Sequence, residues 1–137
     1  MSGQKTVESI WREGLCCDVD MGDFSITVDE PTSVGGTNLG PAPTSLLLAS
    51  VASCFNVAIA YCAGKQRVKL NGLSVSVTGK YDGPRFKSIT IESRLDSDPS
   101  KIKPIVQAAR RVCYVTNTLE SKLEINVLSN GNTISRS

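Results

Sequence analysis

The sequence predicts an α+β fold in a single domain that spans residues 1–137. Three observations carry this prediction. Short segments that alternate apolar and polar residues, as half-buried strands do, lie on both sides of the chain centre. Between them lies an apolar segment of helical length, Pro43–Gly64, and a second, amphipathic helical pattern follows the later strands.

The N-terminal part of the chain predicts a β-meander. Thr6–Arg12 alternates apolar and polar residues, and Phe24–Val28 does so again after a turn. Between them, Leu15–Asp20 resumes the pattern after a break at Gly14. The loop Pro31–Pro43 that follows is rich in Gly, Pro, Ser and Thr, and loops of this length often carry function.

The central helix is predicted to be buried on all sides. Leu46 to Ala63 contains no charge, no proline and no glycine, and its apolar residues cover the whole helical circumference. Pro43 suits the first turn of a helix, and Gly64 suits its end. Cys54 lies near the midpoint, so it faces whatever packs there.

A long hairpin and a second helix follow. Leu73–Lys80 and Phe86–Leu95 alternate on either side of an Asp-Gly-Pro turn. The second helix is predicted from Asp98 to Cys113, with one apolar stripe at spacings of three and four formed by Ile102, Ile105, Val106, Ala109 and Val112. Beyond it we expect a polar turn or short helix at Tyr114–Lys122, a final strand at Leu123–Leu128 and a tail.

A helix that is apolar on every side is hard to cover within so small a domain. One sheet and one amphipathic helix cover only part of its circumference, so a large apolar patch would remain. We therefore expect a homodimer in which the central helices of two copies pair across a large hydrophobic interface.

Composition and charge exclude several classes of protein. A net charge of +2 without a basic run gives no basis for nucleic-acid binding. The chain has no histidine, which removes the usual general base and the commonest metal ligand, and we expect no metal site and no cofactor. The polar N-terminus shows no leader, and Ser50, Ser53 and Asn56 argue against a membrane span, so we expect a cytoplasmic protein.

Five cysteines are the chemically informative residues: Cys16, Cys17, Cys54, Cys62 and Cys113. Their odd number in an apparently cytosolic chain favours reduced or redox-active thiols over a disulfide framework. Buried thiols more often fill core space than catalyse, and spacing alone leaves that interpretation open for Cys54 and Cys113. Core packing is the preferred interpretation of Cys62, and we assign no shared role to Cys16 and Cys17.

A reactive Cys54 would need help from a cation. Burial disfavours the thiolate, and the N-terminus of its own helix is too distant to help, so the charge must come from elsewhere, for instance from Arg12, Arg110 or Arg111. Cys113 is predicted at the C-terminal end of a helix, where the dipole disfavours a thiolate. It is therefore a poor first nucleophile but an acceptable partner for an oxidised Cys54.

Two motifs and the hairpin between them resemble the OsmC/Ohr superfamily of osmotically inducible and organic hydroperoxide resistance proteins. The motifs are GTNLGPAPTSLLLASVASCF (Gly36–Phe55) and AARRVCYVTNTL (Ala108–Leu119). The resemblance implies two antiparallel β-sheets wrapped around two long central helices in an intertwined homodimer. It also implies reduction of hydroperoxides, preferably organic ones, with Cys54 as the peroxidatic cysteine and Cys113 as the resolving cysteine. Arg12 would activate the thiolate, and a dithiol reductant such as a lipoylated protein would recycle the enzyme.

The sequence departs from the family pattern at two positions. Thr44 stands where the peroxidases place a glutamate that orients the arginine, and Tyr114 stands where Ohr proteins have a proline. Thr44 is neutral and too short to form a bidentate pair with a guanidinium. Arg12 would then be held by Ser45, by Glu13 or by the other subunit, or would swing away and leave Cys54 protonated.

Two functions remain as alternatives. The first is a thiol-dependent peroxidase that reduces organic hydroperoxides through a Cys54 sulfenate and a Cys54–Cys113 disulfide. The second is a non-catalytic dimer that binds an apolar small molecule at the dimer seam, with the cysteines as structural residues. A dimer whose partner is another protein is a third possibility, for which no docking surface stands out.

Overall fold

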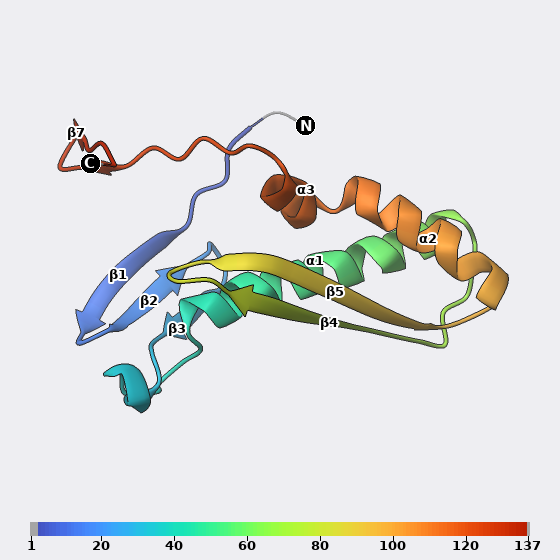
Figure 1. Cartoon of the computed structure of the whole chain (residues 1–137), viewed down its shortest axis with the longest axis horizontal. Helices are drawn as coiled ribbons and strands as arrows, with labels where there is room; N and C mark the ends of the chain where they lie inside the picture. Colours follow the sequence, from blue (N-terminus) through green and yellow to red (C-terminus); the bar gives the residue numbers. More distant parts are fainter. Residues whose placement is uncertain (1–2, 137) are drawn as a thin grey trace. The chain divides into compact units, whose positions relative to one another are not determined.

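The computed structural model describes residues 3–136 and confirms the α+β class with antiparallel sheets (Figure 1). In chain order the elements are β1 (Glu8–Glu13), β2 (Cys16–Asp20), β3 (Ser25–Val28), the 3-10 helix η1 (Thr32–Val34), α1 (Pro43–Lys65), β4 (Gly72–Tyr81), β5 (Phe86–Asp96), α2 (Pro99–Val112), α3 (Tyr114–Glu120), β6 (Leu128–Ser129) and β7 (Asn132–Thr133). The chain divides into two compact units. One contains the chain up to Ser50 and Thr78–Ser88, and the other contains Val51–Val77 and the chain from Ile89 onward.

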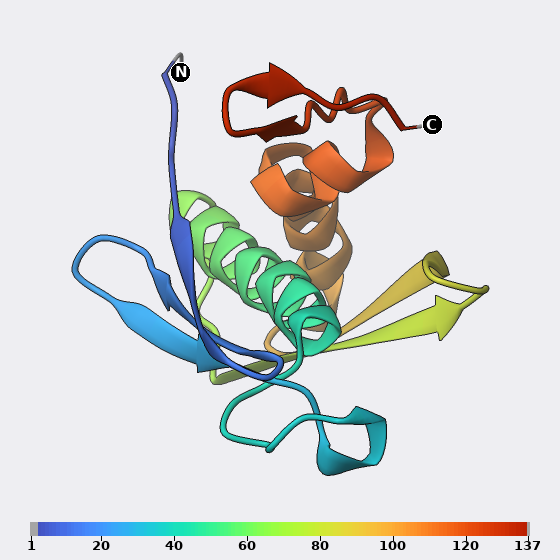
Figure 2. The same ribbon diagram turned by 90° about the vertical axis from the view of Figure 1, so that its left-hand side faces the viewer.

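The first unit contains the antiparallel sheet β1–β2–β3, which is the predicted meander (Figure 2). Cys17 pairs with Val28 across β2 and β3, and Trp11 pairs with Cys17 across β1 and β2. Cys16 and Val28 are buried, whereas every residue of β1 is exposed, including Trp11 at 71%. The prediction of a half-buried first strand is therefore wrong for the single chain, because nothing among residues 3–136 buries β1.

A buried carboxylate organises the loop between β3 and α1. Asp29 accepts hydrogen bonds from the backbone N–H groups of Glu30 (2.7 Å), Thr37 (3.2 Å) and Leu39 (3.2 Å), and from the Thr37 hydroxyl (2.5 Å). Gly36 packs so tightly that a Cβ there would collide with the carbonyl of Glu30. The loop is thus a fixed structure, tied to one charged group.

Replacing Asp29 by asparagine is expected to remove an acid-sensitive part of the stability. The hydrogen bonds from Thr37 and the backbone hold the pKa of Asp29 below its ordinary value of 3.8. A depressed pKa adds stability above the unfolded-state value, and this contribution is lost as the pH falls through the folded-state value. The free energy of unfolding of wild type should therefore exceed that of Asp29→Asn at pH 7, and the difference should close below pH 4.

Urea titrations at several pH values would test this, with Asp23→Asn, which removes a carboxylate at an exposed turn, as the charge-matched control. A difference between wild type and Asp29→Asn that stays constant with pH would contradict the assigned role.

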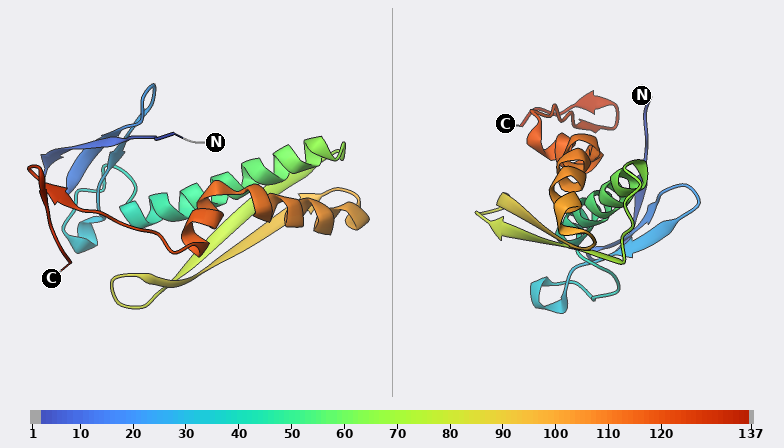
Figure 3. Two further views of the ribbon diagram at one scale, coloured as in Figure 1. Left: turned by 90° about the horizontal axis from the view of Figure 1, so that it is seen from above. Right: turned by 90° about the vertical axis from the view of Figure 1, so that its right-hand side faces the viewer.

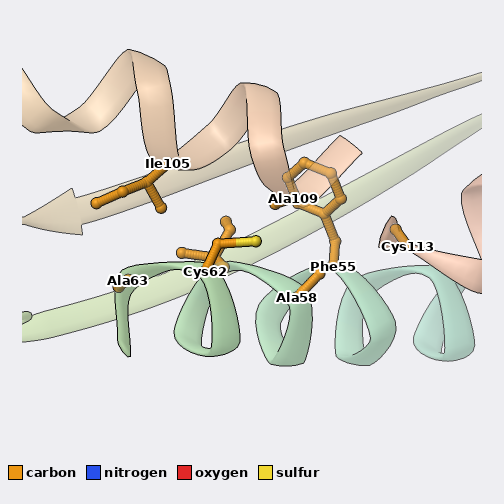
Figure 4. Close-up of a cluster of buried hydrophobic side chains, with 8 residues drawn as sticks. Phe55, Ala58, Cys62, Ala63, Ile105, Ala109 and Cys113 are labelled. Carbon is orange, nitrogen blue, oxygen red and sulfur yellow. The ribbon is translucent and has the colours of Figure 1, made fainter. Parts of the chain in front are cut away.

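The second unit is built on the second half of α1 and on α2, which lie side by side in both views of Figure 3. Ile105 and Ala109 of α2 are fully buried and face Phe55 and Cys62 of α1 (Figure 4). The predicted apolar stripe of α2 is confirmed apart from Val112, which is exposed. The buried cluster consists of Phe55, Ala58, Ile59, Cys62, Ala63, Ile105, Ala109 and Cys113.

Helix α1 is buried on one face only, which corrects the prediction of burial on all sides. Val57 is 67% exposed and Tyr61 is 58% exposed, although both are apolar or aromatic. The single chain has too few elements to surround a helix of this composition. By length and composition alone α1 could cross a membrane, as could many core helices of soluble proteins.

The C-terminal prediction of a strand at Leu123–Leu128 is wrong for the single chain. The segment from Lys122 to Val127 is extended but pairs with no strand among the described residues (Figure 1). Only its end is paired: the Val127 carbonyl accepts a hydrogen bond from the Ile134 N–H (2.8 Å), and Leu128 belongs to β6. A strand needs a neighbour to receive its backbone hydrogen bonds, and between residues 3 and 136 no strand pairs with the rest of the segment. The expected tail instead forms the β6–β7 hairpin, whose turn has Asn130 at φ 49° and Gly131 at φ 83°. An Asn-Gly pair is a strong sequence signal for such a turn.

Candidate active site

The structure brings Cys54 and Cys113 together. Cys54 lies on α1, is partly exposed and packs against the buried cluster of the second unit, to which Cys113 belongs. The thiol of Cys113 and the backbone amides of Tyr114 and Val115 lie close enough to the Cys54 thiol to shift its pKa. Cys54 is thus a partly exposed residue, whereas Cys113 has no exposed surface.

Cys113 occupies a bend between two helices, because the turn or short helix expected at Tyr114–Lys122 is the helix α3 (Tyr114–Glu120). It is the C-cap of α2 and also the N-cap of α3, with an extended backbone at φ −77° and ψ 104°. Asn117 closes the bend, because its side-chain amide donates to the Arg111 carbonyl (3.1 Å) and its backbone N–H donates to the Cys113 carbonyl (2.9 Å). The prediction from the sequence placed Cys113 only at the C-terminal end of a helix. This was incomplete, because Cys113 also precedes α3, whose first backbone N–H groups have no partner within the helix.

The electrostatics of the pair leave Cys54 protonated in this conformation. Burial raises the pKa of the Cys54 thiol above its ordinary value of 9.0, and contact with Cys113 raises it further. The amides of Val115 and Tyr114 act in the opposite direction, because they donate to the sulfur. Since the net pKa shift is upward, Cys54 needs an additional positive charge to ionise at neutral pH.

Arg12 belongs to the first unit and is held there by a carboxylate. The register of β1 and β2 skips Arg12, which is the extra residue of a β-bulge between Trp11 and Glu13. Its Nε lies 3.5 Å from Oδ2 of Asp18, and Oδ1 of Asp18 accepts a hydrogen bond from the Thr27 hydroxyl at 2.8 Å. The sequence suggested Ser45 or Glu13 as the residue that holds Arg12. The structure instead pairs Arg12 with Asp18, which the sequence did not suggest.

Thr44, which replaces the glutamate of the peroxidases, has a different partner. The Tyr81 hydroxyl lies 3.5 Å from Oγ1 of Thr44, and the Tyr81 ring packs on Phe86 with centroids 4.6 Å apart. The Thr44 position thus contacts the tip of the β4–β5 hairpin.

No sequence motif could have identified Asp18 as the partner of Arg12, because the approach of the two side chains depends on strand register.

The remaining cysteines have structural surroundings. Cys62 lies within the buried cluster, as expected, and Cys16 is a buried residue at the start of β2. Burial, followed by the nearby Asp29 carboxylate, raises the pKa of the Cys16 thiol. Between residues 3 and 136, no group of three or more His, Cys, Asp or Glu side chains lies close enough together to hold a metal ion.

Comparison with known proteins identifies relatives across nearly the whole chain. The family model of OsmC-like protein matches residues 36–128, which includes both candidate cysteines. An uncharacterized protein of Haloferax volcanii is 26% identical over 125 residues, covering 87% of this chain and 89% of its own length.

Solved structures agree on the fold. An OsmC-like protein from Mycoplasma pneumoniae matches with a TM-score of 0.77 and 21% identity, over 88% of this chain and 89% of its own. A putative organic hydroperoxide resistance protein from Vibrio cholerae, with captopril bound in one of its active sites, matches with a TM-score of 0.68 and 21% identity, over 98% and 97%. The matched region, which is more than half of the sequence, and the shared fold lead to one conclusion: this chain belongs to the OsmC-like protein family.

Proposed function

We propose that this protein is a thiol-dependent peroxidase that reduces organic hydroperoxides through Cys54 and Cys113. The observation that carries the proposal is the proximity of two thiols of different exposure. Cys54 lies on α1 and is partly exposed, and Cys113 lies at the α2–α3 bend and is buried. Two sulfurs in contact can form a disulfide with little backbone movement, whereas separated structural cysteines cannot. The membership of the OsmC-like family and the similarity to hydroperoxide resistance proteins support the same reaction.

The proposed cycle balances with one hydroperoxide and one external dithiol. The Cys54 thiolate attacks the O–O bond, forming an S–O bond and releasing an alkoxide that takes up a proton to become the alcohol. Cys113, as a thiolate, then attacks the sulfur of the resulting sulfenic acid, so that an S–S bond forms and water leaves. An external dithiol, for which a lipoylated protein is a suitable class, reduces the disulfide and restores both thiols.

Arg12 is proposed as the cation that activates Cys54. The raised pKa of Cys54 supports the need for such a charge, and the family resemblance suggests this arginine as its source. Arg12 and Asp18 are each about half exposed, at 49% and 47% of the side chain, and an exposed ion pair contributes at most about 1 kcal/mol. Exchanging Asp18 for a thiolate or an alkoxide would therefore cost Arg12 little.

Counting free thiols by mass spectrometry tests the reaction directly. The protein is analysed under non-denaturing conditions before and after one equivalent of cumene hydroperoxide. We expect a Cys54–Cys113 disulfide within seconds and three thiols left free at Cys16, Cys17 and Cys62. Five thiols that remain unchanged after long exposure would overturn the proposed peroxidase activity.

The second candidate function is binding of an apolar small molecule without catalysis. The upward pKa shift of Cys54 favours it, because a protonated thiol is inert towards peroxides. Alkylation of Cys54 by iodoacetamide as a function of pH separates the two functions. If the pH midpoint of the alkylation rate stays above that of a free thiol, and no peroxide is consumed, the result would support binding over catalysis.

We also propose that the protein is a homodimer in which the α1 helices pair. The exposed face of α1 carries Val57 and Tyr61 together with small residues at helical spacing, namely Ser53, Ala60 and Gly64. Small residues allow two helix backbones to approach, and the apolar ones leave water on association. The cytoplasm is the proposed compartment, since the five cysteines are all free thiols.

Sedimentation velocity is expected to show a dimer at micromolar concentration. Val57→Glu should shift the boundary towards the monomer, because a carboxylate would be buried against its symmetry copy. Val34→Glu, which places the same charge at an exposed valine of η1, is the matched control. A monodisperse wild-type monomer at these concentrations would refute the dimer.

A further inference from the structure

One four-residue segment contacts both sulfurs of the candidate pair. Cys113-Tyr114-Val115-Thr116 places the backbone amides of Tyr114 and Val115 at the Cys54 thiol. The same segment places Oγ1 of Thr116 3.0 Å from Sγ of Cys113. Both Cys113 and Thr116 are buried, at 0% and 8% exposure, so water does not compete for this contact. The start of α3 brings the two side chains together, because Cys113 is the N-cap and Thr116 is the third helical residue, and side chains at these two positions lie close together.

The direction of this hydrogen bond must depend on the charge of the sulfur. Either atom can be the donor while Cys113 is a thiol. Once Cys113 loses its proton it can only accept, so the Thr116 hydroxyl must donate to it. A buried thiolate without a donor is strongly disfavoured, and a hydrogen bond to a charged acceptor is stronger than one between neutral groups. The hydroxyl can rotate from one arrangement to the other without moving the backbone.

We propose that Thr116 is a positioning residue that stabilises and orients the Cys113 thiolate while it attacks Cys54. The proposal deepens the proposed peroxidase cycle and rests on it for its physiological setting. In that cycle the Cys113 thiol first releases its proton to the medium. The thiolate attacks the sulfenic acid at Cys54, the S–S bond forms and the S–O bond breaks, and the leaving hydroxide takes up a proton from the medium to become water. Thr116 acts in this second step and has no part in the attack of Cys54 on the hydroperoxide.

The attack of Cys113 can be timed without any peroxide. In a Cys17→Ser background, one equivalent of 5,5′-dithiobis(2-nitrobenzoate) reacts at the partly exposed Cys54 and releases one coloured thiolate. Cys113 then attacks the mixed disulfide at Cys54 and releases the second. The first colour phase therefore reports Cys54, and the second reports Cys113. Cys113→Ser identifies the second phase, because it should abolish that phase alone.

Thr116→Val removes the hydroxyl and keeps the shape of the side chain, whereas Thr116→Ser keeps the hydroxyl. We expect the second phase of Thr116→Val to be slower by about tenfold, the usual effect of losing one hydrogen bond to a charged group. The rate of the second phase of Thr116→Val should rise only at higher pH than in wild type, and its first phase should be unchanged. Thr116→Ser should retain the second phase of wild type. Loss of packing alone would not shift the pH profile.

A second phase of Thr116→Val with wild-type rate and wild-type pH profile would overturn the role of Thr116. Failure of the peroxidase proposal has a different signature: cumene hydroperoxide leaves all thiols free, while the two colour phases and their dependence on Thr116 remain.

Discussion

Replacing Cys54 by serine is expected to reduce hydroperoxide consumption to the uncatalysed rate. Cys54 is the partly exposed member of the thiol pair, and a serine hydroxyl is not ionised near neutral pH, so it cannot attack the O–O bond. Fold and stability should be retained, because serine is nearly the same size and the site is only partly buried. Peroxide consumption followed with a ferric–xylenol orange assay, in the presence of dithiothreitol, would measure the loss.

Two further variants show whether the loss is specific. Cys17→Ser, at the other partly exposed cysteine, should leave the rate unchanged. Without dithiothreitol, Cys113→Ser should consume one equivalent of hydroperoxide and then accumulate a Cys54 sulfenic acid that a dimedone probe traps. A Cys54→Ser protein that still turns over hydroperoxide would remove Cys54 from the mechanism.

Replacing Ile105 by alanine is expected to destabilise the protein by about 2–5 kcal/mol, the usual range for removing a large aliphatic side chain from a closed core. Ile105 has no exposed surface and belongs to the buried cluster between α1 and α2 (Figure 4). Its loss would leave a cavity within this closed cluster. Chemical denaturation followed by circular dichroism would measure the change in the free energy of unfolding.

The matched control is Ile10→Ala, the same deletion on β1, where the side chain is 55% exposed. A surface change of this kind usually alters stability by no more than about 0.5 kcal/mol. Equal losses in the two variants would show that the cluster around Ile105 is not the core on which the fold depends.

The elements that local sequence rules govern were predicted closely. The central helix was expected from Pro43 to Gly64 and is observed from Pro43 to Lys65. The second helix was expected from Asp98 to Cys113 and is observed from Pro99 to Val112, with Asp98 as the N-cap that accepts a hydrogen bond from the backbone N–H of Ser100 at 3.0 Å. These features depend on neighbouring residues, so the sequence contains all the information they need.

The predictions that failed concern features whose pairing or burial depends on segments far away in the sequence or outside the chain. The strand expected at Leu123–Leu128 has the right alternation but lacks a partner, and β1 lacks a cover for the same reason. Within the candidate site, the resemblance identified Cys54 and Cys113. The bend at Cys113, the hydroxyl of Thr116 and the pairing of Arg12 with Asp18 follow from tertiary packing and strand register, which no motif encodes.

The uncovered segment after α3 has a consequence for how the protein is made. Leu123, Ile125 and Val127 alternate as strand residues do, and each is more than half exposed, with Ile125 at 78%. If this segment finds its neighbour only in a second copy, the last step of folding is a collision between two chains, and its rate rises with their concentration. Slow synthesis would then leave each new chain monomeric for longer, with an unpaired apolar segment exposed, and such segments promote aggregation. The rate of expression would thus decide how much of the protein matures.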